Sequence, residues 1–243
     1  MSTQVNIPFN TTTPPTSTPL YISRATFTAK GIEQLSRYTS EGIYTAHQFV
    51  WDLFDPVEDR KDRPFMFTPF KGSSFYIQST EIPSDPHGYV KLLTKTIEQP
   101  TMHMGAGLDL RAWVNATVCT RDERIVPKGR SKRLGLQTYE KLMCEANGET
   151  PRDLDALLFE WLERRSEDGG FKLHRVTALT PVFSEQGVGR RNPITMDFVQ
   201  LEARVEVTDP EKFVTLWRNG IGRGKAFGAG LVLLKPAAAL VAL

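Results

Sequence analysis

Hydrophobic positions recur along the chain with two periods, one typical of strands and one typical of helices, and they divide it into two similar halves. In the first half, a strand and a helix precede a pair of strands about a Lys71-Gly72 turn. The predicted elements are strand 21–29, helix 40–54, strands 64–70 and 73–80, helix 86–93 and strand 94–99. This order is the βαββαβ unit of ferredoxin-like and RRM-like folds.

The helix at 40–54 has the clearest pattern of the first half. Ser40 is its predicted N-cap, and Asp55 ends it because a residue before proline leaves helical φ/ψ. Its apolar stripe at helical spacing consists of Ile43, Ala46, Val50, Leu53 and Phe54.

The second half repeats the order around an insertion. Thr150 is the predicted cap of its first helix and Pro151 the first helical residue. The predicted elements are strand 108–120, a basic insertion at 121–150, helix 151–165, strands 171–183 and 194–207, helix 210–219 and strand 231–234. We therefore expect an α+β protein with two tandem ferredoxin-like (RRM-like) domains, at 19–106 and 107–236, between a disordered N-terminal tail at 1–18 and a C-terminal tail at 237–243.

Composition narrows the function classes. The 243 residues carry a net charge of +2, which is too small to indicate nucleic-acid binding by itself. Cys119 and Cys144 form no metal-ligand motif, and the four histidines are far apart, so we expect no metal or other cofactor. Few cysteines, no signal peptide at the polar N-terminus and no long apolar run favour a cytoplasmic protein.

A glycine-rich loop at 220–230 is the most unusual stretch. It matches neither a Walker loop nor a dinucleotide-binding loop, and it follows a helix instead of a strand. Gly222 and Gly228 bare the backbone beside Arg223 and Lys225, which is typical of a phosphate cradle. A glycine-rich turn without a ligand remains the alternative.

Positive charge is concentrated in three predicted loops. They are the insertion with Arg130, Lys132 and Arg133, a hairpin tip with Arg190 and Arg191, and the glycine loop. Such loops bind polyanions, although each alone is also typical of a solvated loop. Because the predicted sheets lack the aromatic signature of an RRM, recognition of a structured RNA by basic loops fits better than base stacking.

His47 lies at the edge of the apolar stripe on the helix at 40–54. Tyr44 is three residues before it and Trp51 four residues after it, so all three share a face. One interpretation is a structural histidine packed against aromatic side chains. The other is a general acid or base, since histidine titrates near neutral pH and can serve the attack of an RNA 2′-hydroxyl on its own phosphate.

Two motifs resemble those of the CasE family of CRISPR precursor-RNA endoribonucleases. One is Tyr44-x-x-His47-Gln48-x-x-Trp51-x-Leu53-Phe54, and the other is the loop from Gly220 to Leu231. The resemblance extends from about Leu20 to Pro236. It implies metal-independent cleavage on the 3′ side of a repeat hairpin, which leaves a 2′,3′-cyclic phosphate and a 5′-hydroxyl. His47 matches the family's catalytic histidine and Tyr44 its nearby tyrosine.

The resemblance also implies partners. The chain is expected to hold the repeat hairpin, retain the mature guide RNA and remain a subunit of a Cascade-type complex. The candidate RNA-binding residues are Arg24, Arg130, Lys132, Arg133, Arg190, Arg191, Gly222, Arg223, Lys225 and Gly228.

One departure from the pattern concerns the cation that stabilises the reacting phosphate. Asp52 stands where a basic side chain would be favourable, which leaves Lys225 and Arg24 as candidates. Two alternatives to the enzyme stay open: a non-catalytic module that only holds guide RNA, and a scaffold subunit whose basic loops contact protein.

Overall fold

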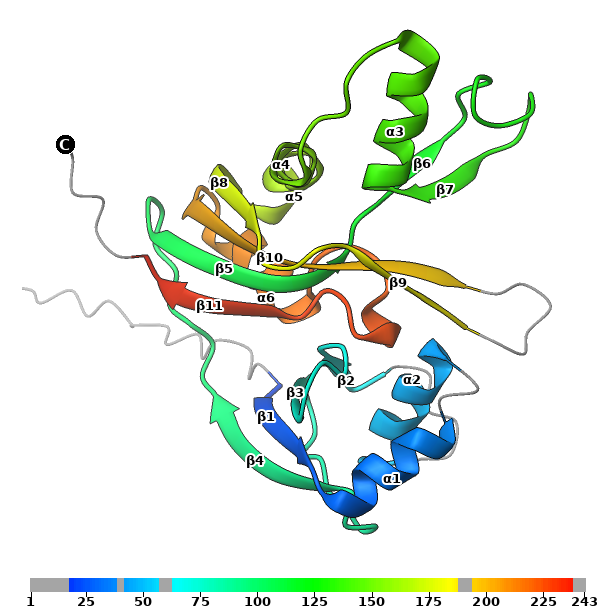
Figure 1. Cartoon of the computed structure of the whole chain (residues 1–243). Helices are drawn as coiled ribbons and strands as arrows, with labels where there is room; N and C mark the ends of the chain where they lie inside the picture. The colour runs from blue at the N-terminus through cyan, green and yellow to red at the C-terminus, as the bar shows by residue number, and fades with distance from the viewer. Residues whose placement is uncertain (1–17, 39–41, 57–62, 188–193, 238–243) are drawn as a thin grey trace, which may run out of the picture.

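The computed structural model describes residues 18–38, 42–56, 63–187 and 194–237. Two antiparallel sheets, one from each half of the chain, lie one above the other in Figure 1 and are joined by the segment between β4 and β5. No helix in the described ranges is long and apolar enough to cross a membrane.

The first sheet has the strand order β2-β3-β1-β4 of a ferredoxin-like unit. Helices α1 and α2 cover one of its faces and share a core of phenylalanine side chains with it. The elements are β1 (Leu20–Phe27), α1 (Ala29–Tyr38), α2 (Ile43–Trp51), β2 (Phe65–Phe67), β3 (Ser74–Ser79) and β4 (Val90–Ile97).

One expectation for this half was wrong, and one helix was missed. The helix predicted at 86–93 is instead a turn that leads into β4, because the Asp85 carboxylate accepts the N–H groups of His87 (3.1 Å) and Val90 (2.6 Å). Helix α1 was not among the predicted elements, and Gly31 within it lowers its helix propensity. A Cβ on Gly31 would come within 2.0 Å of the Tyr89 carbonyl oxygen, so a side chain there would push α1 off the sheet. Helix α2 begins at Ile43; Ser40, its predicted cap, lies outside the described residues.

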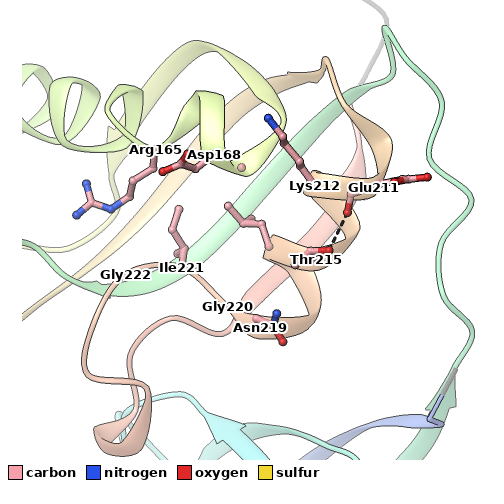
Figure 2. A pocket seen from close by; sticks show the side chains of 11 residues that line it. Arg165, Asp168, Glu211, Lys212, Thr215, Asn219, Gly220, Ile221 and Gly222 are labelled. Carbon is pink, nitrogen blue, oxygen red and sulfur yellow. Dashed lines mark hydrogen bonds between the residues drawn. The ribbon is translucent and has the colours of Figure 1, made fainter.

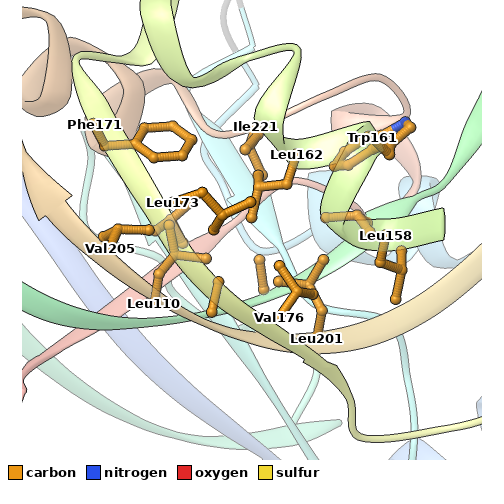
Figure 3. Close-up of a cluster of buried hydrophobic side chains, with 14 of the residues drawn as sticks. Leu110, Leu158, Trp161, Leu162, Phe171, Leu173, Val176, Leu201, Val205 and Ile221 are labelled. Atoms are coloured by element: carbon orange, nitrogen blue, oxygen red, sulfur yellow. The ribbon is translucent and has the colours of Figure 1, made fainter. Parts of the chain in front are cut away.

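The second sheet repeats the order as β11-β5-β10-β8, which confirms the two tandem ferredoxin-like units. Helices α4, α5 and α6 pack on one face over the apolar cluster of Figure 3, in which Leu158, Leu162 and Leu201 are fully buried. The elements are β5 (Gly107–Asn115), α4 (Leu154–Glu163), α5 (Ser166–Gly169), β8 (Phe171–Ala178), β9 (Phe183–Gln186), β10 (Thr195–Val207), α6 (Pro210–Asn219), the 3-10 turn η2 (Lys225–Phe227) and β11 (Val232–Pro236).

The insertion in this half is more ordered than expected. A hairpin of β6 (Thr117–Thr120) and β7 (Lys132–Gly135) leads into helix α3 (Leu136–Asn147), and the group projects from the second sheet (Figure 1). The chain turns at the buried Ala116, so the strand predicted at 108–120 is two strands.

The predicted cap of α4 was also wrong. Asp153 caps the helix by accepting the Ala156 N–H at 2.7 Å, and Thr150 and Pro151 precede it. The residue between them and the cap, Arg152, reaches the buried Glu140 on α3 with its Nε at 2.8 Å and Nη2 at 3.0 Å. This ion pair fastens the insertion to α4.

The two halves are in direct contact. Gln78 on β3 donates to the carbonyl oxygen of Arg218 (3.1 Å), an acceptor that the end of α6 leaves unpaired. A separate apolar cluster spans both halves and contains Ile43, Met196, Phe198 and Ala229. Helix α2, which carries His47, thus packs against both halves at once.

We expect Glu140→Gln to lower the free energy of unfolding by about 1–3 kcal/mol at pH 7, the cost of weakening a charged hydrogen bond. Hydrogen bonds from Arg152 lower the pKa of Glu140 to about 2. The ionised Glu140 carboxylate therefore stabilises the folded protein fully above its unfolded-state pKa of about 4.3. This contribution is lost as the pH falls through the folded-state pKa.

Urea unfolding at pH 7 and pH 3 measures this effect. The gap between the wild type and Glu140→Gln should be smaller at pH 3. Glu145→Gln is the matched control, because Glu145 lies on the same helix in an exposed pair with Lys141. An equal gap at both pH values would contradict the role of Glu140.

Candidate active site

Helix α2 is held at its N-terminal end by the second half. Gly42, with φ 63°, forms an isolated bridge with Gly187 at the end of β9. Gly187 lies against the Tyr44 ring so closely that a Cβ there would come within 2.1 Å of Cε2. At the other end of α2, Phe49 and Val50 are buried in the first core. The orientation of the helix is therefore fixed from both sides.

His47 makes a hydrogen bond with each ring nitrogen. Its Nδ1 lies 2.8 Å from the carbonyl oxygen of Ala226 in η2, and the Trp51 indole Nε1–H donates to Nε2 at 3.0 Å. A carbonyl oxygen only accepts, so Nδ1 carries the proton, and an indole N–H only donates, so Nε2 presents a lone pair. The hydrogen-bond network thus assigns a neutral imidazole with a basic Nε2.

Aromatic rings complete the surroundings of His47. Phe227, next to Ala226, has its ring centroid 5.7 Å from that of His47 and 5.6 Å from that of Tyr44. Tyr44 and His47 therefore face the same side chain of the glycine loop. The structure brings the two predicted catalytic residues together and adds Trp51, Ala226 and Phe227 from the motifs on either side.

The glycine loop needs its glycines for shape. Gly224 and Gly228 have φ values of 88° and 94°, a left-handed region that residues with a Cβ adopt at a cost. A Cβ would come within 1.9 Å of Met196 Cε at Gly224 and 3.1 Å of the Pro69 nitrogen at Gly228. The loop closes through Ile221 N–H, which donates to the Gly230 carbonyl oxygen at 2.8 Å. This loop conformation places η2 against α2.

The loop also leaves backbone donors unpaired. Within the described ranges, the N–H groups of Gly222, Arg223 and Gly224 have no hydrogen-bond acceptor, and the Arg223 side chain is exposed. Such groups are donors that a phosphate oxygen can use. The phosphate cradle stays a prediction, with its donors in place.

Two cations lie near this loop. Lys225 is the first residue of η2, and its side chain crosses Gly230, where a Cβ would come within 3.0 Å of Cγ. Arg63, which the sequence patterns did not single out, donates from Nε to the Phe65 carbonyl oxygen at 2.6 Å. Burial, together with the charge of Arg63, lowers the pKa of Lys225.

The other predicted residues lie in different places. Arg24 is exposed on the first sheet, level with Tyr76 and Leu93, and on the face opposite the neighbouring Ala25, which is buried under α2. The structure does not bring Arg24 to His47. Asp52 is the C-cap residue of α2, and burial raises the pKa of its carboxyl group.

The basic insertion forms a separate surface. Arg130, Lys132 and Arg133 are exposed on and before β7, and none has an ion-pair partner among the residues that the structure describes. Arg124, in contrast, is engaged by Asp122 at 2.7 Å. Arg190 and Arg191 lie outside the described residues.

A hollow of about 470 Å³ lies between α5, α6 and the start of the glycine loop (Figure 2). Its wall carries both charges, with Arg165 and Lys212 beside Asp168 and Glu211. His47 is not among its lining residues, so it is separate from the candidate active site. In the described residues no group of three or more histidine, cysteine or acidic side chains gathers; that no metal takes part stays a prediction.

The sequence and the fold resemble those of known proteins. The sequence matches the family described as CRISPR associated protein over residues 20–236. The chain belongs to this family. The resemblance to CasE that the two motifs indicated is confirmed by the curated relatives.

Two curated relatives define the sequence similarity. The chain is 26% identical to the CRISPR system Cascade subunit CasE of Escherichia coli, over 83% of this chain and 96% of that protein. It is 38% identical over 87 residues to the CRISPR-associated endoribonuclease Cse3 of Thermus thermophilus. That second match spans 31% of this chain and only 41% of the relative's length.

Solved structures share the fold. Cas6e from Escherichia coli superimposes with a TM-score of 0.63 at 20% identity, over 89% of this chain and all of that one. Cse3 bound to a 19-nucleotide RNA gives a TM-score of 0.64 at 22% identity, over 90% of this chain and all of that one. At this identity the likeness supports the two ferredoxin-like units.

We expect Gly228→Ala to displace η2 and separate Ala226 from His47, because the new methyl group meets Pro69 and Phe67. The matched control is Gly72→Ala, where φ is 87° but nothing lies within 4 Å of a Cβ. Backbone strain of about 1–2 kcal/mol should appear in both variants, with a larger loss of stability only in Gly228→Ala.

Urea unfolding and the ¹⁵N NMR shifts of the His47 ring report the two effects. Gly228→Ala should change the ring shifts and Gly72→Ala should not. Equal stabilities and unchanged ring shifts in both variants would show that the loop does not position His47.

Proposed function

We propose that this protein is a metal-independent endoribonuclease that cuts CRISPR precursor RNA at the 3′ base of the repeat hairpin. The observation that carries the proposal is the hydrogen-bonded imidazole of His47, which presents the Nε2 lone pair while the Ala226 carbonyl oxygen holds Nδ1–H. A neutral histidine in this tautomer is a general base. The names of the relatives, a CRISPR-associated endoribonuclease and a Cascade subunit, support the same reaction class.

The proposed reaction needs one proton removed and one supplied. The 2′-hydroxyl takes the place of the Trp51 indole at Nε2, gives its proton to His47 and attacks the adjacent phosphorus. The bond from phosphorus to the 5′-oxygen breaks, and that oxygen takes up a proton. The products are a 2′,3′-cyclic phosphate and a 5′-hydroxyl. The phenol of Tyr44, on the same face of α2, is a second proton-carrying group within the site.

The Ala226 carbonyl has a further role in this step. As Nε2 gains a proton, positive charge develops on the ring, and the carbonyl dipole at Nδ1 stabilises it. The same contact prevents the ring from turning away from the substrate. The glycine loop would therefore orient the base as well as contact the RNA.

The hairpin stem is assigned to the β6–β7 surface. Arg130, Lys132 and Arg133 are exposed and free of ion pairs within the described residues, as phosphate-binding side chains must be before RNA binds. The relatives include Cse3 solved with RNA in a pre-cleavage complex. We place this chain, likewise, on a repeat hairpin in the cytoplasm, where it retains the guide RNA as a subunit of a Cascade-type complex.

A binding module without activity is the alternative. It would require only the basic surface and the glycine loop. The observation that favours the enzyme is that Trp51 and Ala226 fix one tautomer of His47, whereas a histidine that only fills space needs no such control.

We expect His47→Ala to slow cleavage of the repeat RNA by about a hundredfold or more, because a general base contributes on that scale. Single-turnover cleavage of end-labelled RNA gives the rate, and a filter-binding assay should show that hairpin affinity is retained. His174→Ala is the control, since His174 pairs with Glu206 on the second sheet. Cleavage at the wild-type rate by His47→Ala would show that His47 takes no part in the reaction.

We expect the triple substitution of Arg130, Lys132 and Arg133 by alanine to weaken hairpin binding and to reduce the slope of log K against log salt by about 2–3. The matched control replaces three exposed cations of the second half, Arg164, Lys172 and Arg175, and should leave the slope unchanged. The same slope in the wild type and the β6–β7 variant would show that this surface does not contact the RNA.

A further inference from the structure

We propose that Arg63 and Lys225 together form the subsite for the phosphate at which the RNA is cut, an inference that rests on the endoribonuclease function proposed above. The two cations come from different halves of the chain. Arg63 lies just before β2, and Lys225 begins η2 in the glycine loop. Each lies beside a residue that neighbours His47: Arg63 contacts Phe65, and Lys225 precedes Ala226.

Arg63 contacts an aromatic ring that also lies near the proposed base. Its guanidinium carbon lies 5.8 Å from the centroid of the Phe65 ring, and its Nε–H is anchored on the Phe65 carbonyl oxygen. The centroid of the same ring lies 6.4 Å from that of His47 and 5.0 Å from that of Trp51. Arg63 and the imidazole are thus neighbours of a single buried phenylalanine.

Lys225 is tied to the base through the backbone. The next residue, Ala226, supplies the carbonyl oxygen that holds His47. The aliphatic stem of Lys225 packs against Gly230, where a Cβ would come within 3.0 Å of its Cγ. The ammonium group is close enough to Arg63 for the two charges to repel, and both groups are half-buried.

Such an arrangement destabilises the free protein unless an anion binds. Half-buried like charges favour loss of a proton, and burial lowers the pKa of Arg63 as well as that of Lys225. Among the described residues no carboxylate lies within ion-pair distance of either cation. Arg152 and Arg204, in contrast, face Glu140 and Asp109 at 2.8 Å and 2.7 Å. The missing partner of the Arg63–Lys225 pair is therefore expected to come from a ligand.

A phosphodiester is the anion that fits. Two cations of different geometry, a planar fork and a flexible ammonium, can each take a non-bridging oxygen. When the 2′-oxygen attacks, the phosphorus gains a fifth ligand and these oxygens carry additional negative charge, which nearby cations stabilise. The pair also supplies the positive charge near the reacting phosphate, which α2 does not provide because it ends in the acidic Asp52.

The test compares the binding of two RNAs that cannot be cut. Both are the repeat hairpin from the CRISPR array of the same genome, with 2′-deoxyribose at the nucleotide that would attack. One has an ordinary phosphate at the scissile position, and the other has a neutral methylphosphonate. We expect the wild type to bind the neutral RNA about 10- to 100-fold more weakly, the scale of a charge-assisted hydrogen bond.

Arg63→Met/Lys225→Met, which keeps the apolar stems, should lose this discrimination and bind both RNAs within about threefold of each other. The control Lys172→Met/Arg175→Met, with two exposed cations on β8, should discriminate as the wild type does. Equal discrimination by the wild type and the Arg63/Lys225 variant would overturn the proposal. If the methionine variant does not fold, Arg63→Gln/Lys225→Gln replaces it with the same expectation.

The outcome is independent of cleavage. If the wild type fails to cut an RNA that retains its 2′-hydroxyl, the endoribonuclease function is wrong, while the binding comparison still reports whether a phosphate lies between the two cations. If the RNA is cut but the discrimination is absent or insensitive to the two substitutions, the function stands and the subsite is wrong.

Discussion

The hydrogen bond between His47 Nδ1 and the Ala226 carbonyl oxygen joins residues that are 179 positions apart. It can form only if the two ferredoxin-like units are docked and the glycine loop has its left-handed turns at Gly224 and Gly228. Because the Ala226 carbonyl oxygen accepts a hydrogen bond from Nδ1–H, the proton stays on Nδ1 and the other ring nitrogen, Nε2, keeps its basic lone pair. One contact between the units thus sets both the position and the tautomer of the proposed base.

The rest of the structure serves this contact. Helix α2 is anchored by the first core at Phe49 and Val50 and by the second half at Ile43. Gln78 fastens the first sheet to the end of α6, the helix from which the glycine loop departs. The β6–β7 hairpin and α3 form an extension of the second half, attached in part through Arg152 and Glu140, and its basic surface is where we propose that the RNA stem binds.

The sequence predicted the elements with strong periodicity or marked ends: α2 by its apolar stripe, α6 by Pro210 and the loop by its glycines. It did not predict α1, in which Gly31 obscures the pattern, or the turn at Asp85, where side-chain hydrogen bonds decide the conformation. Tyr44 and His47 could be paired because helical spacing is local. Ala226 and Arg63 could not, because a backbone carbonyl has no sequence signature and Arg63 reaches the site only through tertiary packing against Phe65.

We propose that protein side chains alone direct attack by the RNA's own 2′-hydroxyl. The most direct measurement incubates the purified protein in EDTA with the repeat RNA, with the scissile 2′-hydroxyl either present or replaced by hydrogen. We expect cleavage of the first RNA, with a 2′,3′-cyclic phosphate end, and tight binding without cleavage of the second. Cleavage of the deoxy RNA, or tight binding of both RNAs with no cleavage of either, would contradict this proposal.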